Sequence, residues 1–260
     1  MSVPRVKSAV RTVELLEYLA SRPDRPARLR EMCADLDLPR SSAHALLRTL
    51  VAQGWVRTDE DGAVYSIGMR ALLVGTSYLD ADPYLRIITP FLEDLRGQLD
   101  ETVHLGRLDG PDIVYLATRE SRQYVRSGSK VGRRLPAYAT ALGKALLSDR
   151  FGTDLDAHLP HVLEPLTPHT IVDRATLDVT LDEVRVRGYA TDNEENSAGI
   201  KCFAVALRYQ QPAPDAISAS VPLSRLTPQR EREIVESLRV VGDKASRAVR
   251  PVAHGDRWFA

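Results

Sequence analysis

LPRSSAHALLRTLVAQGWVRTDEDGAVYSIG, residues 38–68, is the stretch of this 260-residue chain that decides its N-terminal fold. Pro39 suits the start of a helix, where its missing N–H is not needed, and Gly54 suits the position just past the end. Between them apolar side chains recur at three- and four-residue spacing, which predicts a helix with one buried face. That inner face consists of Ala43, Leu46, Leu47, Leu50 and Val51.

A hairpin is predicted directly after this helix. Residues 55–57 and 64–66 are short β-forming runs, and Asp61-Gly62 between them is a turn signal. Upstream, residues 6–20 and 28–36 have the apolar periodicity of two further helices. Three short helices followed by a hairpin are the layout of a winged helix-turn-helix, although tandem small helices also occur in enzymes and protein-binding modules.

The outer face of the 39–53 helix carries side chains that suit DNA. Arginine can bind guanine or phosphate, and short polar side chains near the start of a major-groove helix reach base edges. No carboxylate occurs from residue 38 to residue 58, although the whole chain is neutral, with 35 basic and 35 acidic residues. Candidate DNA contacts are Arg40, Ser41, Ser42, His44 and Arg48 on this helix, Arg57 on the wing, and Lys7 and Arg11 on the first helix. The alternative role of Ser41 and Ser42 is helix capping.

The composition limits the classes of protein to which this chain can belong. Hydrophobic residues make up 43% of the chain, and no apolar run approaches the roughly 18 residues of a membrane span. The N-terminus lacks the apolar segment of a signal peptide, and Cys33 and Cys202 form no disulfide framework. We therefore expect a cytoplasmic protein with no membrane partner.

The remaining sequence predicts a linker helix and a larger second domain. Residues 68–81 stay apolar on one side, and Asp82-Pro83 ends that helix. Further helices are expected at 84–100, 140–150, 175–188 and 227–249, and strands in a hairpin over 102–120 and in a pair at 200–209 and 216–221. Helices beside a mostly antiparallel sheet give an α+β fold. The expected domains are 1–67, a linker at 68–82, and 83–260.

Five stretches, in order, resemble the IclR family of transcriptional regulators over nearly the whole chain. They are KSAVRTVELLEYLA (7–20), LPRSSAHALLRTLVAQGWV (38–56), VYSIG (64–68), VGRRLPAYATALGKALL (131–147) and GYATDNEENSAGIKCFAVAL (188–207). The resemblance implies a winged helix-turn-helix that binds double-stranded operator DNA and a GAF-like effector-binding domain. It also implies a homodimer, often as a dimer of dimers. Tyr138, where the family often has His, and Leu142, where it often has a smaller residue, depart from the pattern.

A small-molecule site is predicted in the second domain. Thr140 is a candidate N-cap, which leaves the backbone N–H groups of Ala141 and Leu142 for a carboxylate or phosphate. Ser218 and Ser220 are two apart on a strand and share one face. The resemblance implies that the effector pocket is lined by Ala141, Leu142, Asp192, Cys202, Ser218 and Ser220. We expect a small carboxylate or sugar acid from a catabolic pathway; alternatively, the serines face water and Cys202 belongs to the core.

Other motifs fail as catalytic, metal or cofactor sites. Gly143-Lys144 lacks the following Ser or Thr of a phosphate-binding loop. His158 and His161 have no supporting cysteines, so we expect no metal site and no cofactor. Glu194 and Glu195 point to opposite faces of an extended segment, which predicts a solvated loop rather than an acid/base pair.

The leading hypothesis is a sequence-specific transcriptional regulator, a repressor, controlled by a small-molecule effector and without enzymatic activity. Two alternatives stay open. One is a metabolite-binding enzyme built on the α+β domain, and the other is a DNA-binding dimer that responds to no ligand.

Overall fold

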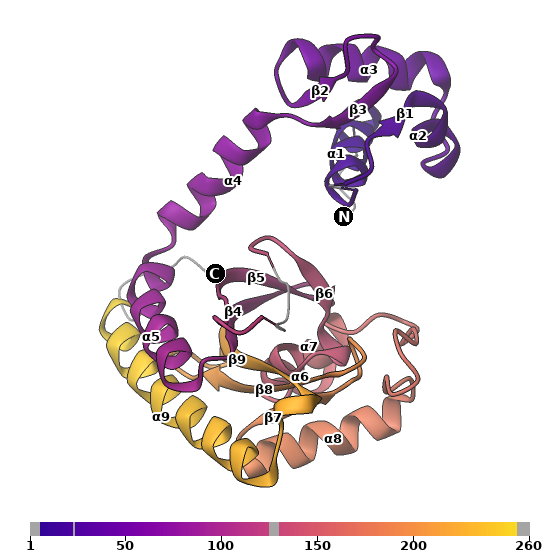
Figure 1. The fold of residues 1–260 in the computed structure, drawn as a ribbon. Coiled ribbons are helices and arrows are strands. Elements are labelled where there is room, and N and C mark those ends of the chain that lie inside the picture. Colours follow the sequence, from indigo (N-terminus) through magenta and orange to yellow (C-terminus); the bar gives the residue numbers. More distant parts are fainter. Residues whose placement is uncertain (1–5, 23, 125–129, 254–260) are drawn as a thin grey trace. The chain divides into compact units, whose positions relative to one another are not determined.

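The computed structural model describes residues 6–22, 24–124 and 130–253, and it divides the chain into two compact units, Met1–Ala81 and Asp82–Ala260 (Figure 1). The predicted class is confirmed, because a helical N-terminal unit with a β-hairpin precedes a larger unit of mixed helix and sheet. No helix in the described ranges is long and apolar enough to cross a membrane.

The first unit is a helical bundle with a small sheet. Its helices are α1 (Lys7–Ala20), α2 (Leu29–Asp35), α3 (Arg40–Ala52) and α4 (Met69–Ala81). The hairpin strands β2 (Val56–Thr58) and β3 (Val64–Ile67) are joined by β1 (Ala27–Arg28) in the order β1-β3-β2. Gly54 has a φ of 74°, so glycine is suited to the sharp turn between α3 and β2.

The core of the first unit lies where the apolar stripes of three helices meet the hairpin. Leu15 of α1, Met32 of α2 and Leu47 of α3 are fully buried, and Val56 of β2 is almost so. Burying each such side chain contributes about 1.5–3 kcal/mol. The opposite face of α3 is thereby left toward solvent.

The second unit is an antiparallel sheet with helices on both faces. Its strands are β4 (Thr102–Asp109), β5 (Asp112–Arg119), β6 (Arg134–Pro136), β7 (Ala190–Asn193), β8 (Ile200–Leu207) and β9 (Asp215–Pro222), in the order β6-β5-β4-β9-β8-β7. The helices are α5 (Pro83–Leu99), α6 (Ala141–Leu147), α7 (Gly152–Ala157), α8 (Arg174–Arg187) and α9 (Pro228–Ala253), with single turns η1 (Ala137–Ala139) and η2 (Leu223–Arg225). Figure 1 shows α5 and α9 packed side by side along the sheet.

Strand alternation decides which helices cover which face. A Cβ on Gly242 of α9 would meet Val205 and Ile217, so these side chains point toward the long helices. The neighbouring Ala204 and Ala216 point the other way and pack with residues of α6 and α8. Ser218, two residues after Ala216, belongs to this second face.

Candidate functional site

The predicted DNA contacts of α3 lie on its outer face. Arg40, Ser41, His44 and Arg48 are exposed, and Ser42 is half-buried. Pro39 occupies the N-cap position, one residue before its predicted place inside the helix, so neither serine is the cap residue. The exposed face therefore combines two arginines, a histidine and a serine.

The wing and α1 carry the other candidate contacts. Arg57 is exposed, and its Nε donates to the hydroxyl of Ser66 at 2.9 Å. Lys7 is exposed and Arg11 half-buried on α1. The wing turn depends on Asp59, whose Oδ1 accepts hydrogen bonds from the N–H groups of Ala63 at 2.7 Å and Val64 at 3.1 Å. These bonds lower the pKa of Asp59.

A cavity of about 230 Å³ lies in the second unit. We call it the Ser218 cavity. All seven predicted effector residues line it, namely Thr140, Ala141, Leu142, Asp192, Cys202, Ser218 and Ser220. Its other lining residues are Tyr115, Arg133, Leu135, Asn196, Ser197 and Ile200.

Hydroxyl groups from β9 form one wall of this cavity. Ser218 and Ser220 are buried, and the Sγ of Cys202 lies 3.2 Å from the Ser220 hydroxyl. Burial raises the pKa of the Cys202 thiol, so this sulfur stays protonated. Within the described residues the Ser218 hydroxyl has no hydrogen-bond partner, which leaves it available to a ligand.

The start of α6 forms the facing wall. The Thr140 hydroxyl accepts the N–H of Gly143 at 3.0 Å, as an N-cap does. The N–H groups of Ala141 and Leu142 belong to the first turn, where no acceptor exists within the helix. Gly143 is required here, because a Cβ would lie 2.0 Å from the carbonyl oxygen of Ala137.

Asp192 is the acidic group of the cavity. Its Oδ1 accepts the N–H groups of Glu195 at 2.8 Å and Asn196 at 3.2 Å. Burial raises its pKa to about 6 in spite of these bonds and of the nearby Lys144 ammonium. Near neutral pH the Asp192 carboxyl can therefore be either ionised or protonated.

Two family models cover most of this chain. The IclR helix-turn-helix domain matches residues 8–60, and the C-terminal domain of bacterial IclR transcriptional regulators matches residues 76–247. The chain belongs to the IclR family. The predicted resemblance is thus confirmed, and the protein is an IclR-type DNA-binding transcriptional regulator with an effector-binding C-terminal domain.

Relatives with known roles agree with this assignment. The chain is 33% identical to the transcriptional repressor IclR of Escherichia coli (strain K12) over 233 residues, which are 88% of this chain and 85% of the repressor. It is 30% identical to the regulator KdgR of the same organism over 243 residues, 93% and 92% of the two chains. A putative transcriptional regulator from Rhodococcus sp. RHA1 superposes with a TM-score of 0.79 at 29% identity, covering 95% of this chain and all of the other.

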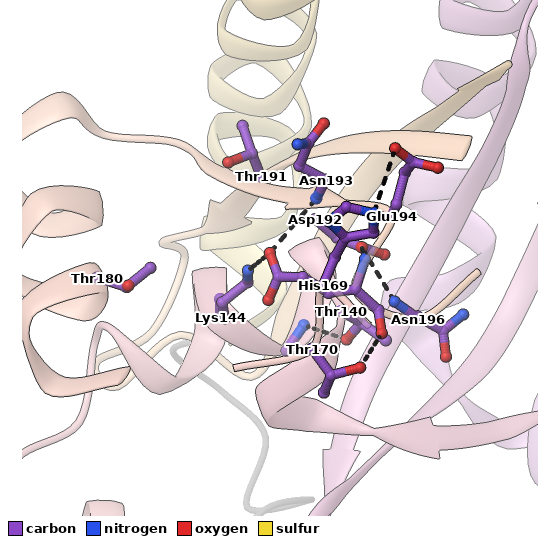
Figure 2. Close-up of polar contacts among 12 residues, drawn as sticks. Thr140, Lys144, His169, Thr170, Thr180, Thr191, Asp192, Asn193, Glu194 and Asn196 are labelled. Atoms are coloured by element: carbon purple, nitrogen blue, oxygen red, sulfur yellow. Dashed lines mark hydrogen bonds and ion pairs between the residues drawn. The ribbon is translucent and has the colours of Figure 1, made fainter. Parts of the chain in front are cut away.

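Behind the Ser218 cavity this IclR-family chain buries an ion pair. Lys144 Nζ lies 2.5 Å from Glu195 Oε1, and the two residues are 1% and 7% exposed. The hydroxyl of Thr170 donates to the carbonyl of Glu195 at 2.6 Å (Figure 2). The hydroxyl of Thr167 donates to the carbonyl of Glu194 at 2.7 Å. The predicted solvated loop is therefore wrong for Glu195, since Lys144, 51 residues away, draws its carboxylate inward.

Several cavity residues were not found by sequence reasoning. Tyr115 and Arg133 come from β5 and the segment before β6, and their side chains reach the cavity only because β6 folds back on β5. Asn196 and Ser197 lie in the turn between β7 and β8. The alternation of side chains along a strand was the one sequence signal that could have identified these cavity residues. It favoured Tyr115 no more than the residues next to it on β5.

Proposed function

We propose that this protein is a repressor whose affinity for operator DNA is set by a small carboxylate or sugar acid bound in the Ser218 cavity. The observation that carries the proposal is the meeting of seven predicted residues around one cavity. The repressor role follows the relatives, which include IclR of Escherichia coli and the acetate operon repressor of Salmonella typhimurium, 33% identical to this chain. Those relatives are regulators, and we propose that this chain likewise has no enzymatic activity.

The cavity chemistry supports this ligand class. Its volume of about 230 Å³ is below the range of about 300–1,000 Å³ usual for drug-sized ligands, which favours a small metabolite. The N–H groups of Ala141 and Leu142 would hold a carboxylate, and Ser218 with Asp192 would bind ligand hydroxyls. The bulk of Leu142 would limit the length of the ligand.

The winged helix-turn-helix of each chain would contact the DNA through two sets of residues. The arginines of α3 would read bases or hold phosphates in the major groove, and Arg57, Lys7 and Arg11 would hold phosphates. We propose a homodimer, and a dimer of dimers on DNA, in the cytoplasm. Exposed apolar side chains on α1 and α4, among them Val13 and Leu72, support a partner of the same chain.

A ligand can change the equilibrium between two arrangements of such a dimer only if it binds the two arrangements with different affinities. We propose that the Ser218 cavity differs between the DNA-competent and the DNA-released arrangements, so that ligand binding favours one of them. The same linkage requires operator DNA to change ligand affinity by the same factor.

The test is fluorescence anisotropy with DNA from upstream of the protein's own gene, against scrambled DNA, across salt concentrations. We expect selective binding with a steep salt slope and a response to a small carboxylate from a metabolite panel. The double variant Ser218→Ala/Ser220→Ala should keep DNA binding and lose the response. A double variant that responds like the wild type would contradict the assignment of this cavity.

A further inference from the structure

A second cavity, of about 490 Å³, lies in the second unit and shares no lining residue with the Ser218 cavity. We call it the Arg150 cavity. It lies toward the Asp215 end of β9, whereas Ser218 is three residues further along that strand, about 10 Å away. Its lining residues are Arg107, Leu108, Arg150, His158, Tyr209, Gln210, Gln211, Pro212, Pro214 and Ala253.

Arg107 is the neutralised cation of this cavity. Its Nε and Nη2 donate to the two carboxylate oxygens of Asp215 at 2.7 and 2.8 Å, and its Nη1 donates to Asp82 at 2.6 Å. Two buried carboxylates thus surround one guanidinium. Arg107 therefore lines the cavity and holds Asp82, the N-cap residue of α5, in place by a hydrogen bond. It gives the cavity no net positive charge.

Arg150 is different. It is 8% exposed, and its Nη1 donates only to the backbone carbonyls of Leu146 at 2.8 Å and Ala213 at 3.3 Å. Its Nε is buried without a hydrogen-bond partner within the described residues. The nearest carboxylate oxygen, on the exposed Asp154, is 3.9 Å from that nitrogen.

Asp149, the other carboxylate near this guanidinium, pairs with Arg208 at 3.1 Å, so Arg150 has no hydrogen-bonded counterion within the described residues. A buried charge needs a hydrogen-bonded partner, and burial lowers the pKa of the Arg150 guanidinium. The Nδ1 of His158 donates to the carbonyl of Gly110 at 2.8 Å, and the Nε2 of this ring lies 3.9 Å from the carboxylate of Asp154. The amides of Gln210 and Gln211 line the same space.

We propose that the Arg150 cavity is a second ligand site, which binds a small oxyanion (a carboxylate or a phosphate group) through the guanidinium of Arg150. The amide of Gln210 supplies a further hydrogen bond to the anion, and Leu108, Pro212 and Pro214 contact an apolar remainder. The chain thus has two separate small-molecule sites in its effector-binding unit.

The test is isothermal titration calorimetry of the full-length protein with inorganic phosphate and, separately, with acetate, at constant ionic strength in chloride. We expect saturable binding of at least one anion, and the tighter of the two identifies the preferred group. Gln210→Glu places a carboxylate in the cavity and should weaken that binding about tenfold or more. Arg150→Met should abolish it, with circular dichroism to check the fold.

The control is the double variant Ser218→Ala/Ser220→Ala, which alters only the other cavity: it should lose any acetate binding in the Ser218 cavity and keep the anion binding that Gln210→Glu weakens. If Gln210→Glu keeps wild-type affinity, the anion binds elsewhere, on the DNA-facing arginines or in the Ser218 cavity, and the proposal is overturned. It is also overturned if neither anion binds saturably.

Discussion

At the scale of single residues, Asp192 makes folding stability depend on pH. The carboxyl has a pKa of about 6 when folded, against 3.8 in an open chain. Well below pH 3.8 it is neutral in both states. As the pH rises through about 6, the unfolded state has already lost its proton while the folded state resists ionisation, so stability falls. The difference approaches about 3 kcal/mol, because one pKa unit corresponds to about 1.4 kcal/mol.

We therefore expect Asp192→Asn to remove this part of the decline in unfolding free energy between pH 4 and 7. Urea denaturation at several pH values measures it. Asp243→Asn, an exposed position on α9 that lines neither cavity, is the control and should keep the wild-type profile. Identical profiles for Asp192→Asn and the wild type would show that Asp192 ionises freely in the folded state.

The buried pair of Lys144 and Glu195 gives a second prediction at this scale. Lys144→Met leaves Glu195 as an uncompensated buried carboxylate, whose Oε2 already has no partner in the described structure. Breaking a buried pair costs about 3–5 kcal/mol. The double variant Lys144→Met/Glu195→Gln should recover part of that loss in urea denaturation. Equal stability of the single and double variants would mean that water solvates the Glu195 carboxylate once Lys144 is replaced.

Residue-scale prediction from sequence succeeded where local geometry was enough. The two-residue spacing of Ser218 and Ser220 put both hydroxyls on one strand face, and Thr140 could be recognised as a cap. Lys144 and Glu195 could not be paired, since their contact depends on how β7 returns beside α6. Arg133 is exposed and polar, so no pattern marks it as a cavity residue.

At the scale of elements, the long helices and strands of the second unit were predictable and its short strands were not. Periodicity placed α8, β8 and β9 within about two residues of their observed ends. β6 and β7 have three and four residues, too few for alternation to be read, and β7 is mostly polar. Both strands exist because a neighbouring strand supplies their hydrogen bonds.

The wing carries the prediction at this scale. Asp59 holds the turn through the N–H groups of Ala63 and Val64, whereas the predicted turn signal was Asp61-Gly62. Asp59→Ala should speed amide hydrogen exchange at Ala63 and Val64 and weaken DNA binding several-fold, because Arg57 is then held less firmly. Asp61→Ala removes an equal charge and should leave the exchange of both amides unchanged. Equal exchange in the two variants would contradict this role for Asp59.

At the scale of the whole molecule, the chain exposes apolar surface that a monomer has no reason to keep. α4 has no buried residue, yet Met69, Leu72 and Leu73 are each more than half exposed. α1 adds Val13, three residues after the half-buried Val10, and its N-cap residue Val6, four residues before Val10, is exposed as well. A helix that is apolar and unburied favours a partner, and the homodimer that we propose would supply one by two-fold symmetry.

Two-fold symmetry also fits the DNA, because paired recognition helices bind half-sites one helical turn apart. If the proposed dimer forms through α4, Leu72→Glu/Leu73→Glu should convert it into monomers, which light scattering measures. Affinity for a two-half-site operator should fall at least tenfold, since each module then binds alone, while affinity for a single half-site stays nearly constant. Val186→Glu on α8, an apolar position that is 90% exposed, should leave the oligomeric state as in the wild type. If the α4 variant stays dimeric and binds the operator with normal affinity, α4 is not part of the interface. Substitutions on α1 would then be the next to test.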